Sequence, residues 1–269
     1  MDLGLSGKRA IVTGGSRGIG LAVAGVLAAE GAHVALVARS EPDLRAAAAQ
    51  VGARMAGGGN QVVTIVADTR SEESVQAMVA HTVTEFGGVD ILVNAAARPA
   101  SSGRVQALAE LTDDALRTEI ETKVLGYLRC ARAVAPHLIA QGWGRIVNIS
   151  GLNARQSGSL VGSVRNVAVA AMTKNLADEL GPHGINVTVV HPGVTVTERT
   201  PGMLADLAAE RGITSDELLA TMSSTVSIGR LVTGDEVADV VAFLASPRSV
   251  SINGDAVAVG GGARGAIHY

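Results

Sequence analysis

Short runs of β-branched residues alternate with longer stretches rich in alanine, leucine and valine along most of the chain. Continuous apolar runs of this length are typical of strands buried on both faces of a parallel sheet, and the longer stretches are typical of the helices that connect such strands. The alternation predicts an α/β fold with a doubly wound, mostly seven-stranded parallel sheet flanked by helices. The predicted strands are residues 9–13, 33–38, 62–67, 91–94, 145–150, 186–191 and 256–259.

One segment, residues 198–227, departs from this alternation. It contains Pro201 and Gly202, then a stretch rich in leucine and alanine, then a run of serines and threonines. We expect this segment to form a lid over a substrate pocket, and a plain surface insertion is the alternative. No repeat or low-complexity linker divides the chain, so residues 1–269 are predicted to form a single domain, which is a length that one large α/β domain can fill.

The composition favours a protein that binds a small molecule. Apolar residues make up 47% of the 269 residues, the formal net charge is -3, and no run of basic residues is present to attract nucleic acid. No apolar stretch is long enough for a signal peptide or a spanning helix, so we expect a cytoplasmic protein without a membrane partner. Cys130 is the only cysteine, which excludes an intrachain disulfide and a cysteine-cluster metal site. We expect no metal.

A glycine-rich segment directly follows the first predicted strand, and residues 13–20 read TGGSRGIG. Gly14 permits a tight turn, Gly18 lets the backbone approach a phosphate, and Gly20 allows the following helix to pack closely on the strand. The N-terminus of that helix offers free N–H groups and a positive dipole end to a pyrophosphate. The segment therefore predicts dinucleotide binding, and a glycine-rich turn without a ligand is the alternative.

The end of the second predicted strand indicates which dinucleotide is bound. A carboxylate at this place would accept a hydrogen bond from the 2′-hydroxyl of NAD, but Ala38 stands there. Arg39 and Ser40 follow it, and Arg17 lies in the glycine-rich segment, so two guanidinium groups can converge on the 2′-phosphate of NADP. We therefore expect NADP(H) to be favoured over NAD(H). The alternative is that Arg39 only caps an exposed loop.

Three further segments complete a familiar pattern: ADT at 67–69, DILVNAA at 90–96 and HPGVTVT at 191–197. Together with the glycine-rich segment, they resemble the short-chain dehydrogenase/reductase family along essentially the whole chain. The resemblance implies a Rossmann fold, an oxidoreductase activity and a homotetramer. It also implies cofactor contacts from Gly14, Ser16, Arg17, Gly18, Ile19, Gly20, Arg39, Ser40, Asp68, Thr69, Asn94, Ala95, Pro192, Gly193, Val194 and Thr197.

The chain lacks the tyrosine–lysine pair on which that family's chemistry usually depends. Its tyrosines are Tyr127 and Tyr269 and its lysines are Lys8, Lys123 and Lys174, so no Tyr-x-x-x-Lys spacing exists. In the usual mechanism the tyrosine, with its pKa lowered by the lysine ammonium, exchanges a proton with the substrate while hydride moves to or from nicotinamide. The sequence predicts an atypical active site, and we expect Tyr127 to pack in a helix interface.

Other residue types fill the positions that the resemblance assigns to catalysis. The segment GRIVNIS at 144–150 and the helical stretch at 166–180 serve as anchors. They place Gly151 at the serine position, Gly162 at the tyrosine position and Asn166 at the lysine position. Lys123 takes the position of a supporting asparagine on the preceding helix.

Five residues are candidates for catalysis or substrate contact: Lys123, Ser150, Asn153, Arg155 and Asn166. A partly desolvated lysine can act as an acid or a base, so Lys123 could restore a positive charge beside Asn166. Ser150 could replace the missing serine, while Asn153 and Arg155 lie in a polar loop that could orient or clamp a substrate. Two alternatives stay open: a surface lysine paired with a glutamate of its own helix, and a loop of turn-forming and helix-capping residues.

Three classes of function fit this pattern. The first is an NADP(H)-binding oxidoreductase with a rebuilt proton relay, acting on a small carbonyl or alcohol compound. The second is a non-redox enzyme of the lyase or isomerase type on the same scaffold. The third is a noncatalytic nucleotide-binding protein. The first class leads because the residues expected beside the nicotinamide are retained.

Overall fold

The computed structural model describes residues 2–55, 59–97 and 107–264, so Tyr269 lies outside the described ranges. A seven-stranded sheet forms the centre of the molecule, with the order β3-β2-β1-β4-β5-β6-β9 and every neighbouring pair parallel. The strands are β1 (Arg9–Thr13), β2 (His33–Ala38), β3 (Val62–Val66), β4 (Ile91–Asn94), β5 (Gly144–Ile149), β6 (Ile185–Pro192) and β9 (Ala256–Val259). The predicted sheet is confirmed, and each strand end lies within one residue of its predicted place.

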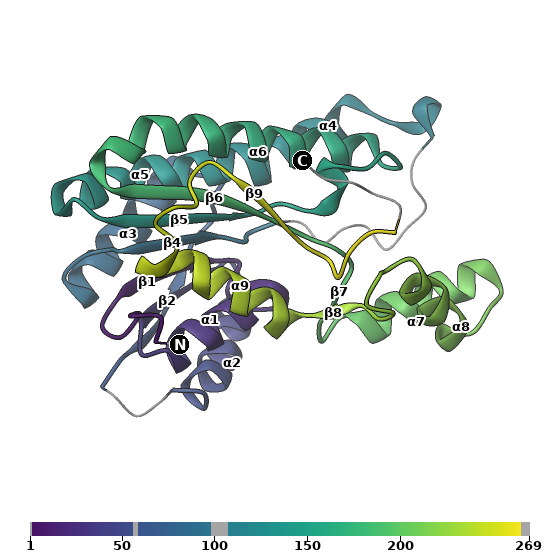
Figure 1. Cartoon of the computed structure of the whole chain (residues 1–269), viewed down its shortest axis with the longest axis horizontal. Coiled ribbons are helices and arrows are strands. Elements are labelled where there is room, and N and C mark those ends of the chain that lie inside the picture. The colour runs from purple at the N-terminus through teal and green to yellow at the C-terminus, as the bar shows by residue number, and fades with distance from the viewer. Residues whose placement is uncertain (1, 56–58, 98–106, 265–269) are drawn as a thin grey trace.

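Helices cover both faces of this sheet (Figure 1). One face carries α1 (Gly18–Ala29), α2 (Glu41–Gly52) and α9 (Gly234–Ala245). The other carries α3 (Glu72–Phe86), α5 (Gly126–Gln141) and α6 (Leu160–Leu180). Single turns of 3₁₀ helix lie at Leu108–Glu110, Leu152–Ala154, Gly181–His183 and Pro247–Ser249. Within the described ranges, no helix is long and apolar enough to cross a membrane.

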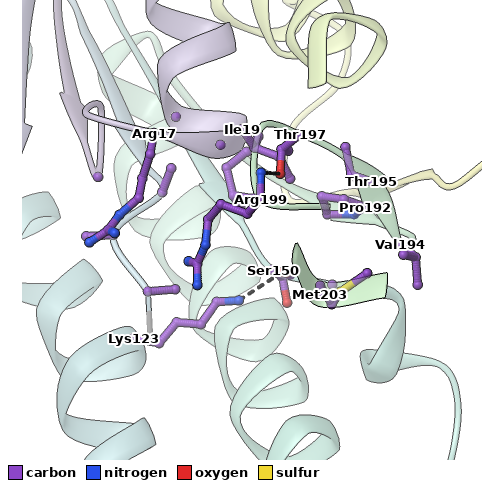
Figure 2. A pocket seen from close by; sticks show the side chains of 18 of the residues that line it. Arg17, Ile19, Lys123, Ser150, Pro192, Val194, Thr195, Thr197, Arg199 and Met203 are labelled. Carbon is purple, nitrogen blue, oxygen red and sulfur yellow. Dashed lines mark hydrogen bonds between the residues drawn. The ribbon is translucent and has the colours of Figure 1, made fainter. Parts of the chain in front are cut away.

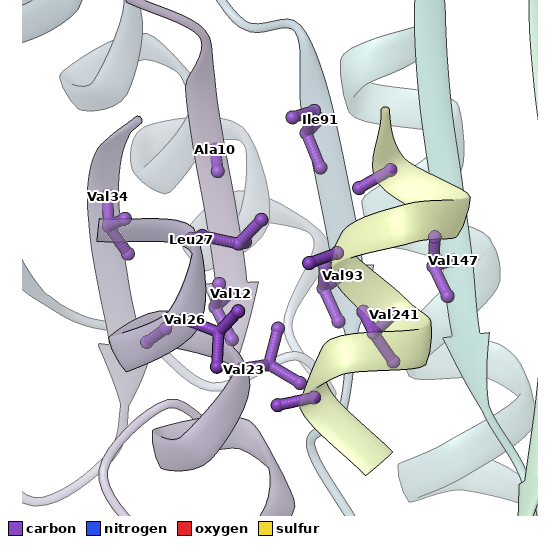
Figure 3. Packing of buried hydrophobic residues seen from close by; sticks show 14 of the residues in the cluster. Ala10, Val12, Val23, Val26, Leu27, Val34, Ile91, Val93, Val147 and Val241 are labelled. Atoms are coloured by element: carbon purple, nitrogen blue, oxygen red, sulfur yellow. The ribbon is translucent and has the colours of Figure 1, made fainter. Parts of the chain in front are cut away.

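The larger core lies between the sheet and the pair formed by α1 and α9 (Figure 3). Val23 and Leu27 of α1 and Val241 of α9 face Val12 and Val93 of the sheet, and all five side chains are fully buried. Burying one such side chain contributes about 1.5 to 3 kcal/mol. This packing fixes the N-terminus of α1 at the carboxyl ends of the strands.

The helix that precedes β5 changes from α-helical to π-helical winding in its middle part, which lies beside the candidate site. It begins as α4 (Asp113–Glu119), continues as a π-helical segment (Ile120–Leu125) and ends as α5. Short π-helical segments inside α-helices are uncommon and are frequent at functional sites. Lys123 lies within the segment and is buried.

The predicted lid region folds as a pair of helices set apart from the sheet, at the right of Figure 1. It comprises α7 (Thr200–Arg211) and α8 (Ser215–Ser224), which pack on each other through Leu204, Ala208 and Leu218. Two short parallel strands frame the pair, β7 (Thr195–Val196) before it and β8 (Val232–Thr233) after it. The helix pair is therefore held at both of its chain ends.

Candidate functional site

A cavity of about 1350 Å³ lies at the carboxyl ends of the parallel strands. Its walls come from the loops that follow β1 to β6, and α7 and α8 add Met203, Asp206, Thr221 and Met222. Ligands of doubly wound sheets bind in this crevice, where strand order reverses. Here β1 lies between β2 and β4, so the reversal falls beside the glycine-rich segment.

The glycine-rich segment leaves room for a ligand's phosphates. Gly14 and Gly18 have φ values of 69° and 57°, which side chains rarely tolerate. A Cβ on Gly14 would lie 2.7 Å from the carbonyl oxygen of Ala95, and a Cβ on Gly20 would lie 2.3 Å from that of Gly14. Only glycine allows this close approach of the backbone, so the predicted cradle is present and fits a dinucleotide pyrophosphate.

The first N–H of α1 already has an anionic partner. Arg17 is the N-cap, and the N–H of Gly18 donates to the two carboxylate oxygens of Glu198 at 3.0 and 3.2 Å. The sequence analysis did not identify this contact. Glu198 directly follows the segment 191–197 in the chain, but its partner lies 180 residues away, so the contact depends on the tertiary fold.

Two unpaired arginines line the end of the cavity nearest β2. Arg17 and Arg39 both belong to its lining, and neither guanidinium forms a hydrogen bond or ion pair with another residue in the described part of the chain. Asp68 is engaged instead by Arg70, with 2.6 Å between its Oδ2 and Nη2, and these hydrogen bonds hold the Asp68 pKa below its usual value. Ser40 accepts a hydrogen bond from the N–H of Asp43 and so caps α2.

Most of the expected cofactor contacts line the cavity, and one does not. The lining includes Gly14, Ser16, Arg17, Gly18, Ile19, Gly20, Arg39, Ser40, Asp68, Thr69, Ala95, Pro192, Gly193, Val194 and Thr197. Asn94 is fully buried behind this wall, where its Nδ2 donates to Oδ1 of Asn148 at 2.9 Å. The Asn94 amide therefore ties β4 to β5, and a contact between Asn94 and the cofactor stays a prediction.

Lys123 lies deep in the cavity wall and is only 3% exposed. Its Nζ donates to the carbonyl oxygen of Ser150 at 2.8 Å and to Oδ1 of Asn166 at 3.0 Å. Burial lowers its pKa from 10.5 to about 7, and the guanidinium of Arg165 adds to this shift while Glu119 opposes it. A lysine in this state can hold or release a proton near neutral pH.

The alternative of a surface lysine paired with its own helix is wrong. Glu119 instead forms an ion pair with Arg165 of α6, and Glu121 pairs with Arg129, with 2.7 Å between Oε1 and Nη1. Both glutamates therefore have arginine partners. Lys123 is left among neutral oxygen acceptors.

Polar side chains surround the two glycines at the family's serine and tyrosine positions. A Cβ on Gly151 would lie 3.0 Å from Nδ2 of Asn166. A Cβ on Gly162 would lie 2.9 Å from both Nδ2 of Asn153 and Oγ of Ser159. The Ser150 hydroxyl donates to the backbone oxygen of Asn166 at 3.1 Å and thereby ties the end of β5 to α6.

Tyr127, Arg155 and Cys130 make structural contacts. Tyr127 is fully buried in a helix interface, as predicted, and donates to the carbonyl oxygen of Ile149 at 3.0 Å; burial raises its pKa above the usual range. Arg155 lies outside the cavity lining, and its Nη2 donates to the carbonyl oxygen of Ala256 at 2.9 Å. Cys130 is buried in the core, and its burial raises the thiol pKa to about 12.

Figure 2 shows a cation at the site that the sequence analysis missed. Arg199 precedes α7, lines the cavity, and directs its guanidinium toward the ammonium end of Lys123. Its place two residues after Thr197 was a usable signal, but the direction of its side chain depends on the turn that begins α7. No group of three or more potential metal ligands occurs among residues 2–55, 59–97 and 107–264.

Comparison with known proteins agrees with this geometry. A family model described as short chain dehydrogenase matches residues 8–207. The short-chain reductase protein NovJ of Streptomyces niveus is 38% identical over 254 residues, which cover 94% of this chain and 92% of NovJ. L-sorbose reductase from Gluconobacter frateurii, solved with NADPH and L-sorbose, has a TM-score of 0.89 and 31% identity over 99% of this chain and 100% of its own. An NAD⁺-bound xylitol dehydrogenase has a TM-score of 0.86 and 28% identity over 96% and 99%.

Proposed function

The chain belongs to the short-chain dehydrogenase family, and from this premise we propose that it is an NADP(H)-dependent oxidoreductase with an atypical proton relay, acting on a small carbonyl or alcohol compound. One observation supports the relay above all others. The amine of Lys123, with a pKa of about 7, lies at the closed end of a cavity whose glycine-rich wall fits a dinucleotide.

The cofactor's position follows from the residues that line the cavity. Gly14, Gly18 and the N-terminus of α1 would hold the pyrophosphate. Arg17 and Arg39 would bind a 2′-phosphate, which supports NADP(H) over NAD(H) because Ala38, and not a carboxylate, stands at the end of β2 where a 2′-hydroxyl would bind. When bound, the nicotinamide supplies or accepts a hydride.

The proton relay rests on an exchange of residue types between two helices. By the family resemblance, position 123 usually carries an asparagine and position 166 a lysine, and here the two types are reversed. The side chains still meet, with 3.0 Å between Nζ of Lys123 and Oδ1 of Asn166. The exchange therefore keeps both an amine and an amide at this place, but the amine now reaches it from the π-helical segment.

The hydrogen bonds of Lys123 leave it one free donor. An ammonium carries three N–H groups, and two of them are used by Ser150 and Asn166. The third is available to a substrate oxygen or to a water molecule that contacts one. Near pH 7 the group exchanges between ammonium and amine, so it can donate a proton during reduction and accept one during oxidation.

The reacting oxygen would lie beside Asn153, which lines the cavity and whose amide occupies the place where a side chain at position 162 would begin. The amide of Asn153 and the hydroxyl of Ser159 lie within contact of the place where a tyrosine side chain would begin. Both can donate hydrogen bonds but neither titrates near neutral pH. These groups can orient an oxygen, and the proton has to come from Lys123 or through water.

The two glycines at the serine and tyrosine positions, Gly151 and Gly162, favour two other functions. A non-redox enzyme of the lyase or isomerase type would use Lys123 for proton transfer alone and keep the nucleotide as a fixed charge. A noncatalytic nucleotide-binding protein would need no acid at all. Gly151 and Gly162 favour both, since neither can exchange a proton.

A substrate screen separates these three functions. Small carbonyl compounds are incubated with NADPH and small alcohols with NADP⁺. Both the absorbance of the reduced nicotinamide and the mass of the product are recorded. The proposal expects matched changes in cofactor and product. A product without net cofactor change favours the non-redox enzyme, and cofactor binding without any product favours the noncatalytic protein.

A further inference from the structure

The contact between Glu198 and Gly18 places a carboxylate at the anion site of α1. The Gly18 N–H is the first of this helix, and its two acceptors are the carboxylate oxygens of Glu198 at 3.0 and 3.2 Å. Unpaired N–H groups and the dipole of a helix N-terminus attract any anion, whether carboxylate or phosphate. One N–H cannot donate fully to both a carboxylate and a pyrophosphate.

The segment that carries Glu198 is held in place from both sides. Before it, β7 pairs with β8 through Thr195 and Val232. After it, the N–H of Thr197 donates to Oγ1 of Thr200 at 2.8 Å, which closes a turn at the start of α7. The carboxylate is thus presented to α1 by a fixed turn, and it belongs to the segment that leads into the lid helices.

We propose that Glu198 competes with the pyrophosphate of the cofactor for the N–H of Gly18, so that it lowers cofactor affinity and must leave α1 when the dinucleotide binds. This inference rests on the proposed dinucleotide binding at the glycine-rich segment. A competing anion of the same molecule lowers the affinity for a ligand, because only the fraction of molecules in which the site is free can bind it. Removing its charge therefore tightens binding without adding any contact to the ligand.

The test is a fluorescence titration of NADPH into wild-type protein, Glu198→Gln and a control, Glu210→Gln. Glu210 lies on α7, is exposed and is not among the residues that line the cavity, so the control removes the same charge away from the site. We expect Glu198→Gln to lower the Kd for NADPH about 2- to 5-fold, the change typical of a carboxylate at an exposed helix N-terminus. Glu210→Gln should leave the Kd unchanged. Glu198→Ala, which also removes the acceptor, should shift the Kd at least as far as Glu198→Gln.

A second ligand separates local competition from a general charge effect. Adenosine 2′-monophosphate carries the 2′-phosphate but no pyrophosphate, so its affinity should be the same in wild type and Glu198→Gln. Equal tightening of both ligands, or an unchanged Kd for NADPH in Glu198→Gln, would overturn the competition while leaving the proposed function intact. If neither wild type nor variants bind NADPH, the proposed function itself fails. Circular dichroism checks that all variants keep the wild-type fold.

Discussion

The state of a single amine, that of Lys123, connects burial to the proposed chemistry. Its pKa is lowered to about 7, so the unfolded chain, with the usual pKa near 10.5, holds a proton that the folded protein releases. Between these two values the unfolded state binds more protons, and the free energy of unfolding rises with pH across the window. We expect lysine labelled with ¹³C at Cε to show one titration near pH 7 by NMR. Lys8 and Lys174 are the other lysines, so Lys123→Met assigns the signal and should also remove the rise in stability.

Replacement of Lys123 also tests its part in turnover. Lys123→Met removes the amine but keeps an unbranched side chain of similar length, so kcat should fall by about 10² to 10⁴, the usual contribution of a positioned acid or base. The Kd for NADPH should stay within error because the proposed contacts to the 2′-phosphate come from Arg17 and Arg39 and not from Lys123. Lys174→Met is the matched control, since Lys174 is exposed and pairs only with Asp178. Unchanged turnover in Lys123→Met would remove this residue from the mechanism.

Cofactor choice depends on the arginine that follows β2. Arg39→Ala should weaken NADPH by roughly 1.5 to 3 kcal/mol, the scale of a charge-assisted hydrogen bond, and should leave NADH nearly unchanged. Arg45→Ala on the exposed face of α2 is the control, because Arg45 pairs with Glu41 on its own helix. The emission of NADPH is the direct measurement, since the only tryptophan, Trp143, lies before β5 at the opposite end of the sheet. An equal loss of affinity for NADPH and NADH would contradict the proposed contact between Arg39 and the 2′-phosphate.

The sequence was a sufficient guide wherever one residue acts through its own chemistry. Gly14 and Gly18 could be recognised because the turn requires their positive φ values, and Gly20 because a Cβ there would lie 2.3 Å from the carbonyl oxygen of Gly14. Asn94 and Arg155 could not, since an amide or a guanidinium can donate equally well to a ligand, to another side chain or to a backbone carbonyl, and only the packed neighbours decide between them.

At the scale of elements, strands were more predictable than the helix that carries Lys123. A buried strand is marked by its own β-branched residues, and turn residues mark its ends. The π-helical segment Ile120–Leu125 has no comparable sequence signal, because its extra residue per turn is stabilised by what the helix contacts. The sequence therefore indicated that Lys123 faces the active site, but it left open a surface position beside its neighbouring glutamates.

The loop after β5 and the start of α6 determine whether the usual chemistry can be restored. Ser, Tyr and Lys at positions 151, 162 and 166 alone should give little reductase activity, because the tyrosine would begin 2.9 Å from Asn153 and Ser159, and the new lysine would meet Lys123. Adding Lys123→Asn removes the contact between the two lysines, and Asn153→Gly removes one of the two groups that crowd the tyrosine. NADPH oxidation with a panel of small ketones should then appear in the variant with all five substitutions. Equal activity in the variant with only the first three substitutions would show that these contacts impose no obstacle.

Helix α6 exposes an apolar face in the described part of the molecule. Leu160, Val164 and Val167 of α6 are 51%, 43% and 49% exposed, and their spacing places them on one side of the helix. The opposite side of α6 carries Asn166 and packs toward the cavity. Contiguous exposed apolar side chains of this kind usually mark an interface, and the family resemblance places a dimer contact on this helix and the one before it.

Self-association through this face is expected to yield a homotetramer. Light scattering at micromolar concentration should give about four times the chain mass of 27.2 kDa. Val167→Glu would place a charge where the apolar faces meet, and burying it unpaired is costly, so the measured mass should fall to that of a smaller assembly. Ile213→Glu is the control, because Ile213 is similarly exposed but lies between α7 and α8. A wild-type monomer would reject the assembly, and a tetramer that persists in Val167→Glu would move the interface to another face.

If the variant dissociates and also loses turnover while its NADPH affinity is kept, the α6 contact supports the geometry of Asn166 and Lys123 on the helix's inner side.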